Sequence, residues 1–72
     1  MDFSEALKAL KMGNRVCRTG WNGREMWIEL QRPDSGSKMS LPYLFIKTVD
    51  NHLVPWLASQ TDILANDWML YI

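Results

Sequence analysis

The chain has 72 residues, of which 47% are hydrophobic, and its eight basic and eight acidic side chains give a formal net charge of zero. This length allows a single domain, residues 1–72, with one thin core, and neither sign of charge forms a run that could follow the phosphates of a long nucleic acid. No basic and apolar leader opens the sequence, and no apolar stretch reaches the ~18 residues of a membrane span. We therefore expect a cytoplasmic protein whose partners include neither a membrane nor a long nucleic acid.

The thin core predicts reinforcement from outside the chain. A domain of this length gains only about 3–5 kcal/mol from its core, and small domains usually add disulfides, a metal or partner subunits. A disulfide within one chain is excluded because Cys17 is the only cysteine, and Cys17 with His52 makes a poor metal site. We therefore expect a homo-oligomer with no metal and no cofactor.

The first expected element is an amphipathic helix. Asp2 followed by Glu5 predicts a capping pair, and Gly13 ends the apolar repeat. The residues that repeat with helical spacing are Phe3, Ala6, Leu7 and Leu10. A short β-prone segment, residues 15–19, follows the helix and predicts the first strand.

A tight turn and a second strand come next. Gly20-Trp21-Asn22-Gly23 predicts the turn, because its glycines and its asparagine tolerate a positive φ. In the strand that follows, alternate residues point to opposite faces of the sheet. We expect Met26, Ile28 and Leu30 on the core face, and Trp27, Glu29 and Gln31 on a face that remains available.

The middle of the chain predicts a loop and a hairpin. Residues 32–40 are rich in serine, proline and glycine and have no apolar period, which is typical of a loop. Residues 43–49 are aromatic and β-branched enough for a third strand, and Asp50-Asn51 predicts the hairpin turn into Leu53 and Val54. Pro55 should end that strand or place it on an edge of the sheet.

The last segment predicts a second helix and a final strand. Ser59 and Asp62 form a second capping box for a short helix that reaches about Ala65, and residues 68–72 form the last strand. The whole pattern predicts an α+β domain, with a small antiparallel sheet of about four to five strands, an N-terminal helix, and a short helix before the last strand.

The side chains that could carry catalysis lack the neighbours that catalysis requires. Cys17 lies in the middle of a strand, where a thiol is normally buried and inert, and His52 lies in a turn without a nucleophile or a second histidine nearby in the sequence. Asp62 and Asp67 flank the second helix, where capping or surface roles are as reasonable as contact with a ligand. We therefore predict no catalytic residues and no enzyme activity.

The tryptophans point instead to ligand binding. Trp21 at the tip of a turn is difficult to bury within a small domain, so we expect it to stack on a ligand or to lie in an interface. For Trp27, contact with a ligand or an interface and packing within the domain are equally reasonable roles. Trp56 and Trp68 lie in apolar runs that are typical of a core. The second helix begins with side chains and free N–H groups that suit a pyrophosphate, although capping alone explains them equally well. The expected ligand-binding residues are Trp21, Asn22, Arg24, Trp27, Ser59, Gln60, Thr61 and Asp62, with two exposed rings to sandwich a purine.

Several strings of residues together resemble a known family. They are Phe3-Ser4-Glu5-Ala6-Leu7, Arg18-Thr19-Gly20-Trp21-Asn22-Gly23, Lys47-Thr48, and the stretch from Val54 to Asp62 that continues to Asp67-Trp68. The sequence is similar over nearly its whole length to the phage Thoeris anti-defence sponges of the second type. The Trp-Asn-Gly and Pro-Trp-Leu-Ala-Ser-Gln-Thr-Asp strings carry most of the resemblance.

This resemblance implies a specific function. A sponge of this type captures a cyclic ADP-ribose-type signal, a glycocyclic isomer, without cleaving it, and thereby starves the bacterial Thoeris effector. Family members are homotetramers, and some hold cyclic oligonucleotide signals at a second site. This chain has a much shorter segment between Gln31 and Leu41 than its relatives, and Tyr43-Leu44-Phe45 where relatives are more polar. The second site and the identity of the ligand therefore stay open.

Two other functions remain as alternatives at this stage. One is a nucleotide-cleaving enzyme, and the other is a structural phage subunit whose tryptophans fill an interface. Recovery of intact ligand from the protein would distinguish a sponge from both.

Overall fold

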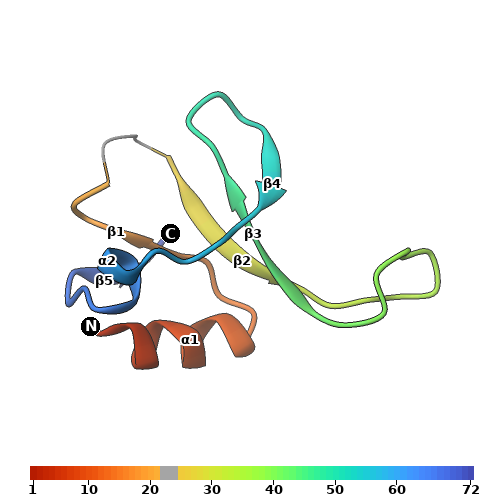
Figure 1. Ribbon diagram of the computed structural model, residues 1–72, viewed down its shortest axis with the longest axis horizontal. Helices are drawn as coiled ribbons and strands as arrows, with labels where there is room; N and C mark the ends of the chain where they lie inside the picture. The colour runs from red at the N-terminus through yellow and green to blue at the C-terminus, as the bar shows by residue number, and fades with distance from the viewer. Residues whose placement is uncertain (22–24) are drawn as a thin grey trace.

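The computed structural model describes residues 1–21 and 25–72, and these residues form one layer of helix against one sheet (Figure 1). The elements in chain order are α1 (Phe3–Lys11), β1 (Val16–Arg18), β2 (Trp27–Gln31), β3 (Tyr43–Lys47), β4 (Leu53–Pro55), α2 (Gln60–Ile63) and β5 (Trp68–Leu70). The α+β class, the five-stranded antiparallel sheet, the N-terminal helix and the short helix before the last strand are confirmed.

The sheet has the strand order β4-β3-β2-β1-β5, and each neighbouring pair is antiparallel. The last strand therefore pairs with the first, with Arg18 opposite Trp68. Pro55 ends β4 at one edge, where the missing N–H of proline costs the sheet no hydrogen bond. This topology brings the segment after β1 next to the segment before β5, and the candidate site lies there.

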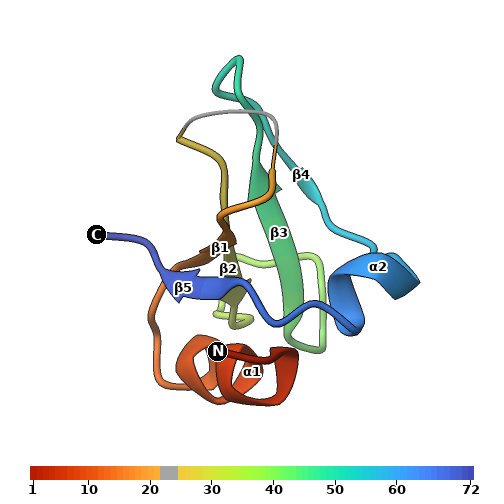
Figure 2. The ribbon, with the colours of Figure 1, turned by 90° about the vertical axis from the view of Figure 1, so that its left-hand side faces the viewer.

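The core lies between α1 and one face of the sheet. Ala6 and Leu10 of α1 are fully buried against Val16 and Ile28, which face each other on β1 and β2. Trp68 closes this core at the β5 end. Figure 2 shows α1 along this side of the sheet, with α2 near its margin. Among the described residues, no helix covers the opposite face.

Both helices begin with the capping boxes that the sequence predicts. The Asp2 side chain accepts the N–H of Glu5 in α1, and the Ser59 side chain accepts the N–H of Asp62 in α2. Each cap is worth about 1 kcal/mol because it satisfies N–H groups that the first turn leaves free. Gly13 follows α1 with φ +92°, in the left-handed region that glycine adopts without strain.

The observed elements are shorter than their sequence patterns. Helix α2 ends at Ile63 rather than at about Ala65, and β5 ends at Leu70 rather than at Ile72. Beyond Leu70 one further contact continues, because the Tyr71 N–H donates to the Arg15 carbonyl at 2.9 Å. Pairing with the adjacent strand determines where a strand ends, and the sequence of the strand alone does not predict which strand it pairs with.

The segment between β2 and β3 extends away from the sheet as a long loop, with Met39 exposed on it (Figure 1). The shorter β3–β4 hairpin turns at Thr48–His52, where Asn51 adopts φ +68° and donates its N–H to the Thr48 carbonyl at 3.0 Å. This confirms the Asp50-Asn51 turn, since asparagine tolerates the left-handed region. No helix of the described residues is long and apolar enough to cross a membrane.

Candidate functional site

Trp21 is half-buried and packs against the core instead of standing free at a turn tip. Its ring meets Trp68 edge to face, with centroids 5.4 Å apart, and its indole Nε1 donates to the Asp62 carboxylate at 3.2 Å. The expectation that a small domain could not cover Trp21 is wrong, because β5 and α2 approach the end of β1 in space. The residue nevertheless remains partly exposed.

Arg18 connects the two segments that meet at Trp21. Its Nε donates to Asp67 Oδ1 at 2.8 Å, and its Nη1 donates to Asp62 Oδ1, also at 2.8 Å. The Arg18 and Asp62 side chains are only 19% and 14% exposed, so these ion pairs are screened less than surface pairs. One planar guanidinium thus holds both carboxylates in fixed positions.

Asp67 in turn fixes the backbone that precedes Trp21. Its Oδ2 accepts the Gly20 N–H at 2.9 Å and the Thr19 hydroxyl at 3.3 Å. A Cβ on residue 20 would lie 2.8 Å from the same oxygen, closer than any real contact. Gly20 is therefore required by this close approach and not by a positive φ, which corrects one reason for expecting glycine there.

The electrostatics of this cluster favour charged carboxylates. Hydrogen bonding from Arg18 holds the pKa of Asp67 below its ordinary value. For Asp62, burial acts to raise the pKa, but hydrogen bonds from Arg18, Ser59 and Trp21 outweigh it and the pKa is lowered. The same pairs raise the pKa of Arg18. The two carboxylates and the one guanidinium therefore sum to one net negative charge in this cluster.

Helix α2 presents a short row of polar side chains next to this cluster. Ser59, Gln60 and Thr61 are exposed, and the Ser59 and Thr61 hydroxyls lie 2.8 Å apart. The capping box already occupies the Ser59 hydroxyl and the Asp62 carboxylate. Capping is thus one role that these residues have, while Gln60 and Thr61 are exposed in the same turn that carries Asp62, the partner of Trp21.

Trp27 lies on the opposite face of the sheet from Trp21. It is 8% exposed, packs against Phe45 and Tyr71, and carries the Arg15 guanidinium 4.1 Å above its ring centre. Since β2 alternates, its neighbour Ile28 points to the α1 side together with Val16. The expectation that Trp21 and Trp27 are two exposed rings of one chain that sandwich a purine is therefore wrong. Asn22 and Arg24, also expected at the site, lie outside the described residues.

Of the two remaining tryptophans, Trp68 belongs to the core, as expected, and Trp56 packs against the core from its margin. Trp68 is 2% exposed and donates its indole N–H to the Asp62 carbonyl at 2.9 Å. Trp56 is half-buried and meets Trp68 edge to face at 6.1 Å. Of these rings, Trp21 bonds to Asp62 of α2, and Trp68 bonds to the carbonyl of the same residue. The site thus stands on an aromatic cluster with Trp68 at its centre.

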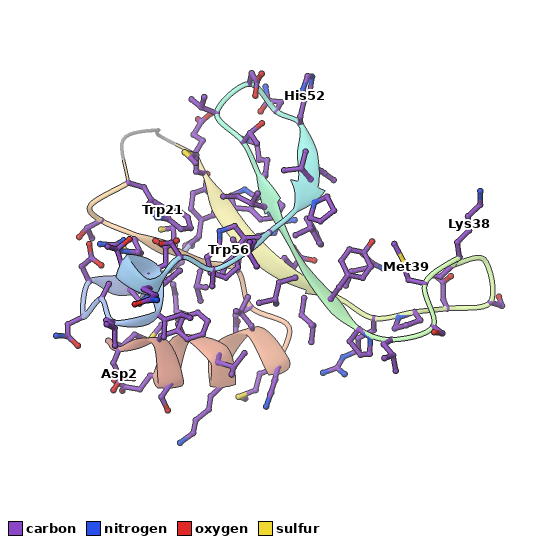
Figure 3. All side chains as sticks on the ribbon, in the orientation of Figure 1. Asp2, Trp21, Lys38, Met39, His52 and Trp56 are labelled. Carbon is purple, nitrogen blue, oxygen red and sulfur yellow. The ribbon has the colours of Figure 1, made fainter. Side chains whose placement is uncertain are left out.

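The residues with catalytic potential lie apart from this cluster. Cys17 is half-buried on the face opposite α1, and burial raises the pKa of its thiol. His52 is exposed at the end of the β3–β4 hairpin, far from Trp21 in Figure 3. In the described part of the chain, no group of three or more His, Cys, Asp or Glu side chains could hold a metal ion.

Arg18 is the site residue that the sequence pattern did not reveal. It lies 44 and 49 positions from its two carboxylate partners, so no local spacing pairs them. The one available sign was its place directly before Thr19-Gly20-Trp21, in a string already distinctive enough to carry a family resemblance.

Comparison with known proteins agrees with that resemblance. Residues 1–71 match the family model of the Thoeris anti-defense 2-like domain. The chain belongs to this family. It is similar to a protein of Bacillus phage SP01 named "Thoeris anti-defense 2", with 42% identity over 81 residues that cover 94% of this chain and 91% of the relative. The alignment is longer than this chain, so the relative carries additional residues.

Membership in the Thoeris anti-defense 2-like family supports a role against the Thoeris defence of bacteria. It is also consistent with a protein that does not catalyse a reaction. The half-buried Trp21, the Arg18 cluster and the polar row of α2 then form the candidate ligand site of a family member.

Proposed function

We propose that this protein is a non-enzymatic sponge that sequesters a cyclic ADP-ribose-type signal, such as a glycocyclic ADP-ribose, in the cytoplasm of the infected bacterium. The observation that carries this proposal is the bond from Trp21 Nε1 to Asp62, which holds a partly exposed tryptophan against the turn of α2 that carries the exposed Gln60 and Thr61. An aromatic ring next to amide and hydroxyl groups suits a purine nucleotide, since stacking and polar contacts can act together.

The charges around Trp21 suggest how such a ligand lies. The adenine stacks on Trp21, because every base has a π-face and the ring is held rigidly by Asp62 and Trp68. The phosphates lie toward Gln60 and Thr61 and not at Arg18, whose charge is already matched by two carboxylates. The net negative cluster would repel a pyrophosphate placed on it.

We further propose that the protein acts as a homotetramer, and that the ligand pocket lies between subunits. The grooves of the single chain that are lined by Tyr43, Phe45 and Leu53, or by Leu7 and Leu44, lie away from Trp21. One domain of this size has little depth to enclose a dinucleotide. A neighbouring chain would complete a pocket over Trp21.

The sheet face opposite α1 is the surface that we assign to subunit contact. It carries Tyr43, Phe45 and Leu53 on β3 and β4 beside the buried Trp27, and Leu53 is 62% exposed. Antiparallel sheets normally turn polar residues to solvent on such a face. Exposed aromatic and aliphatic side chains of this kind are typical of subunit interfaces.

Light scattering at micromolar concentration tests this assignment. Wild-type protein should have the mass of a tetramer, whereas Leu53→Glu should shift it toward smaller species. Met12→Glu is the matched control, because Met12 is 82% exposed at the end of α1, away from this face. A folded wild-type monomer would contradict the proposed oligomeric state. Dissociation by Met12→Glu but not by Leu53→Glu would contradict the assignment of the interface to this face.

The sponge itself is tested by recovery of the ligand. Purified protein is incubated with glycocyclic ADP-ribose, washed, and heated to unfold it, and the released material is identified by mass spectrometry. Intact ligand supports a sponge, a cleaved product would show an enzyme, and no uptake would favour a structural phage subunit. A parallel incubation with a cyclic dinucleotide determines whether a second site of that kind exists despite the short 32–40 segment.

A further inference from the structure

We propose that Arg18 is a positioning residue for ligand binding: it does not touch the ligand, and it sets the orientation of the Trp21 ring through Asp62. This inference rests on the proposed function and adds to it a residue that determines affinity. Arg18 lies at the end of β1, directly before the turn segment that carries Trp21. Three observations support it.

The first observation is that one oxygen serves both partners. Asp62 Oδ1 accepts the Arg18 Nη1–H at 2.8 Å and the Trp21 Nε1–H at 3.2 Å. The Ser59 N–H holds the other oxygen of this carboxylate, and the guanidinium holds the oxygen that accepts the indole. Movement of Asp62 would therefore move the Trp21 ring or leave its indole N–H without this partner.

The second observation is that Arg18 also controls the backbone of the turn. Its Nε holds Asp67, and Asp67 accepts the N–H of Gly20, the residue before Trp21. One guanidinium group thus fixes, through Asp67, the main chain before Trp21 and, through Asp62, the Trp21 side chain. A planar fork can satisfy two carboxylates from Nε and Nη1 at once, whereas the single ammonium of lysine cannot reproduce that geometry.

The third observation is electrostatic. Arg18 is 19% exposed and neutralised by Asp62 and Asp67, so it offers little net positive charge to a phosphate. An arginine that bound the ligand directly would be expected with an unpaired face and net positive surroundings. The geometry therefore assigns Arg18 to orientation of the aromatic ring.

A double-mutant comparison separates positioning from direct contact. Arg18→Gln should weaken binding of glycocyclic ADP-ribose about tenfold in an otherwise wild-type protein, a part of what a stacked base contributes. The same change in a Trp21→Ala background should have less than about a twofold effect, because the ring that Arg18 orients is gone. Arg18→Lys should bind as weakly as Arg18→Gln. All titrations are done well below the melting temperature of the least stable variant.

Arg32→Gln is the matched control. It also removes one guanidinium, whose Nη2 donates to the Lys11 carbonyl at 2.8 Å, but it lies remote from Trp21. This control should bind like wild type. An equal loss for Arg18→Gln in both backgrounds would show that Arg18 contacts the ligand, and unchanged affinity in a folded variant would show that it has no role.

A readout without ligand keeps the inference separate from the proposed function. In a ¹⁵N correlation spectrum the Trp21 indole resonance is identified by its disappearance in Trp21→Phe. Arg18→Gln should shift that resonance and accelerate its exchange with solvent, while the Trp27 indole resonance stays in place. If wild-type protein fails to bind the nucleotide, the proposed function is wrong, and a Trp21 indole that is unaffected by Arg18→Gln overturns the positioning role by itself.

Discussion

Trp21 and Trp68 meet edge to face, with ring planes 79° apart and centroids separated by 5.4 Å. This geometry gives favourable aromatic contact beyond the area that it buries. Trp21 therefore belongs partly to the core and partly to the surface, while Trp68 belongs to the core alone. The two residues should respond differently to truncation.

Trp21→Ala is expected to weaken nucleotide binding about tenfold to a hundredfold, because a stacked base is worth ~1–3 kcal/mol. Since the ring also packs on Trp68 and bonds to Asp62, we expect a lower melting temperature as well, with the fold retained. Calorimetric titration and thermal melting of the same preparation measure both effects. Wild-type affinity in this variant would rule out the stacking role.

Trp68→Ala is expected to destabilise the domain much more severely. The side chain is 2% exposed and contacts the rings of Phe3, Trp21 and Trp56. Truncation of such a buried tryptophan costs ~3–5 kcal/mol, which is comparable to the whole stability of a small domain. Circular dichroism should show a largely unfolded chain at 37 °C. A melting temperature equal to that of Trp21→Ala would mean that the two rings contribute alike to the core.

Gly20→Ala is expected to disturb the site although alanine adds one methyl group only. The new Cβ would lie 2.8 Å from Asp67 Oδ2, the atom that also accepts the Gly20 N–H. Asp67 must then move, and Arg18 loses one of its partners. We expect a lower melting temperature and weaker binding together, whereas Gly36→Ala, whose Cβ would find an ordinary 3.5 Å contact, should leave both unchanged.

Acid should reduce the stability that the Arg18 cluster gives to the fold. The pKa values of Asp62 and Asp67 are lower in the folded protein than their ordinary values. The cluster therefore stabilises the fold fully at a pH above those ordinary pKa values. This contribution is lost as the pH falls through the folded pKa values. The melting temperature should therefore drop between roughly pH 5 and pH 2.

The share of the Arg18 cluster in this acid response can be isolated. Hydrogen bonding from Thr48 also lowers the pKa of Asp50, so wild-type protein loses stability in acid from more than one place. Asp67→Asn should melt earlier at neutral pH and show a shallower loss toward acid. If the melting temperature of Asp67→Asn fell with pH in parallel with that of wild type, Asp67 would not contribute to the loss of stability in acid.

Cys17→Ser and His52→Ala are expected to leave nucleotide capture intact. Burial raises the pKa of the Cys17 thiol, which disfavours the reactive thiolate, and His52 is exposed on a distant hairpin. Slow alkylation of Cys17 by iodoacetamide at neutral pH checks its low reactivity. Loss of capture in either folded variant would argue against a sponge without catalysis.

The sequence by itself determined the class of the fold and its local signals. Capping at Asp2 and Ser59, the turn at Asn51 and the edge position of Pro55 all follow from interactions within a few residues of the chain. Such interactions are local, so a pattern of residue types is enough to reveal them. The family strings were also visible without any structure.

Only the tertiary structure decided how Trp21 is held and which face Trp27 occupies. Arg18 joins carboxylates 44 and 49 positions away, because β5 returns to pair with β1 and carries Asp67 to the end of that strand. Trp21, which the sequence pattern predicts as exposed, becomes half-buried because a distant segment covers it. Contacts of this kind depend on strand order, and strand order is set by the packing of the whole chain.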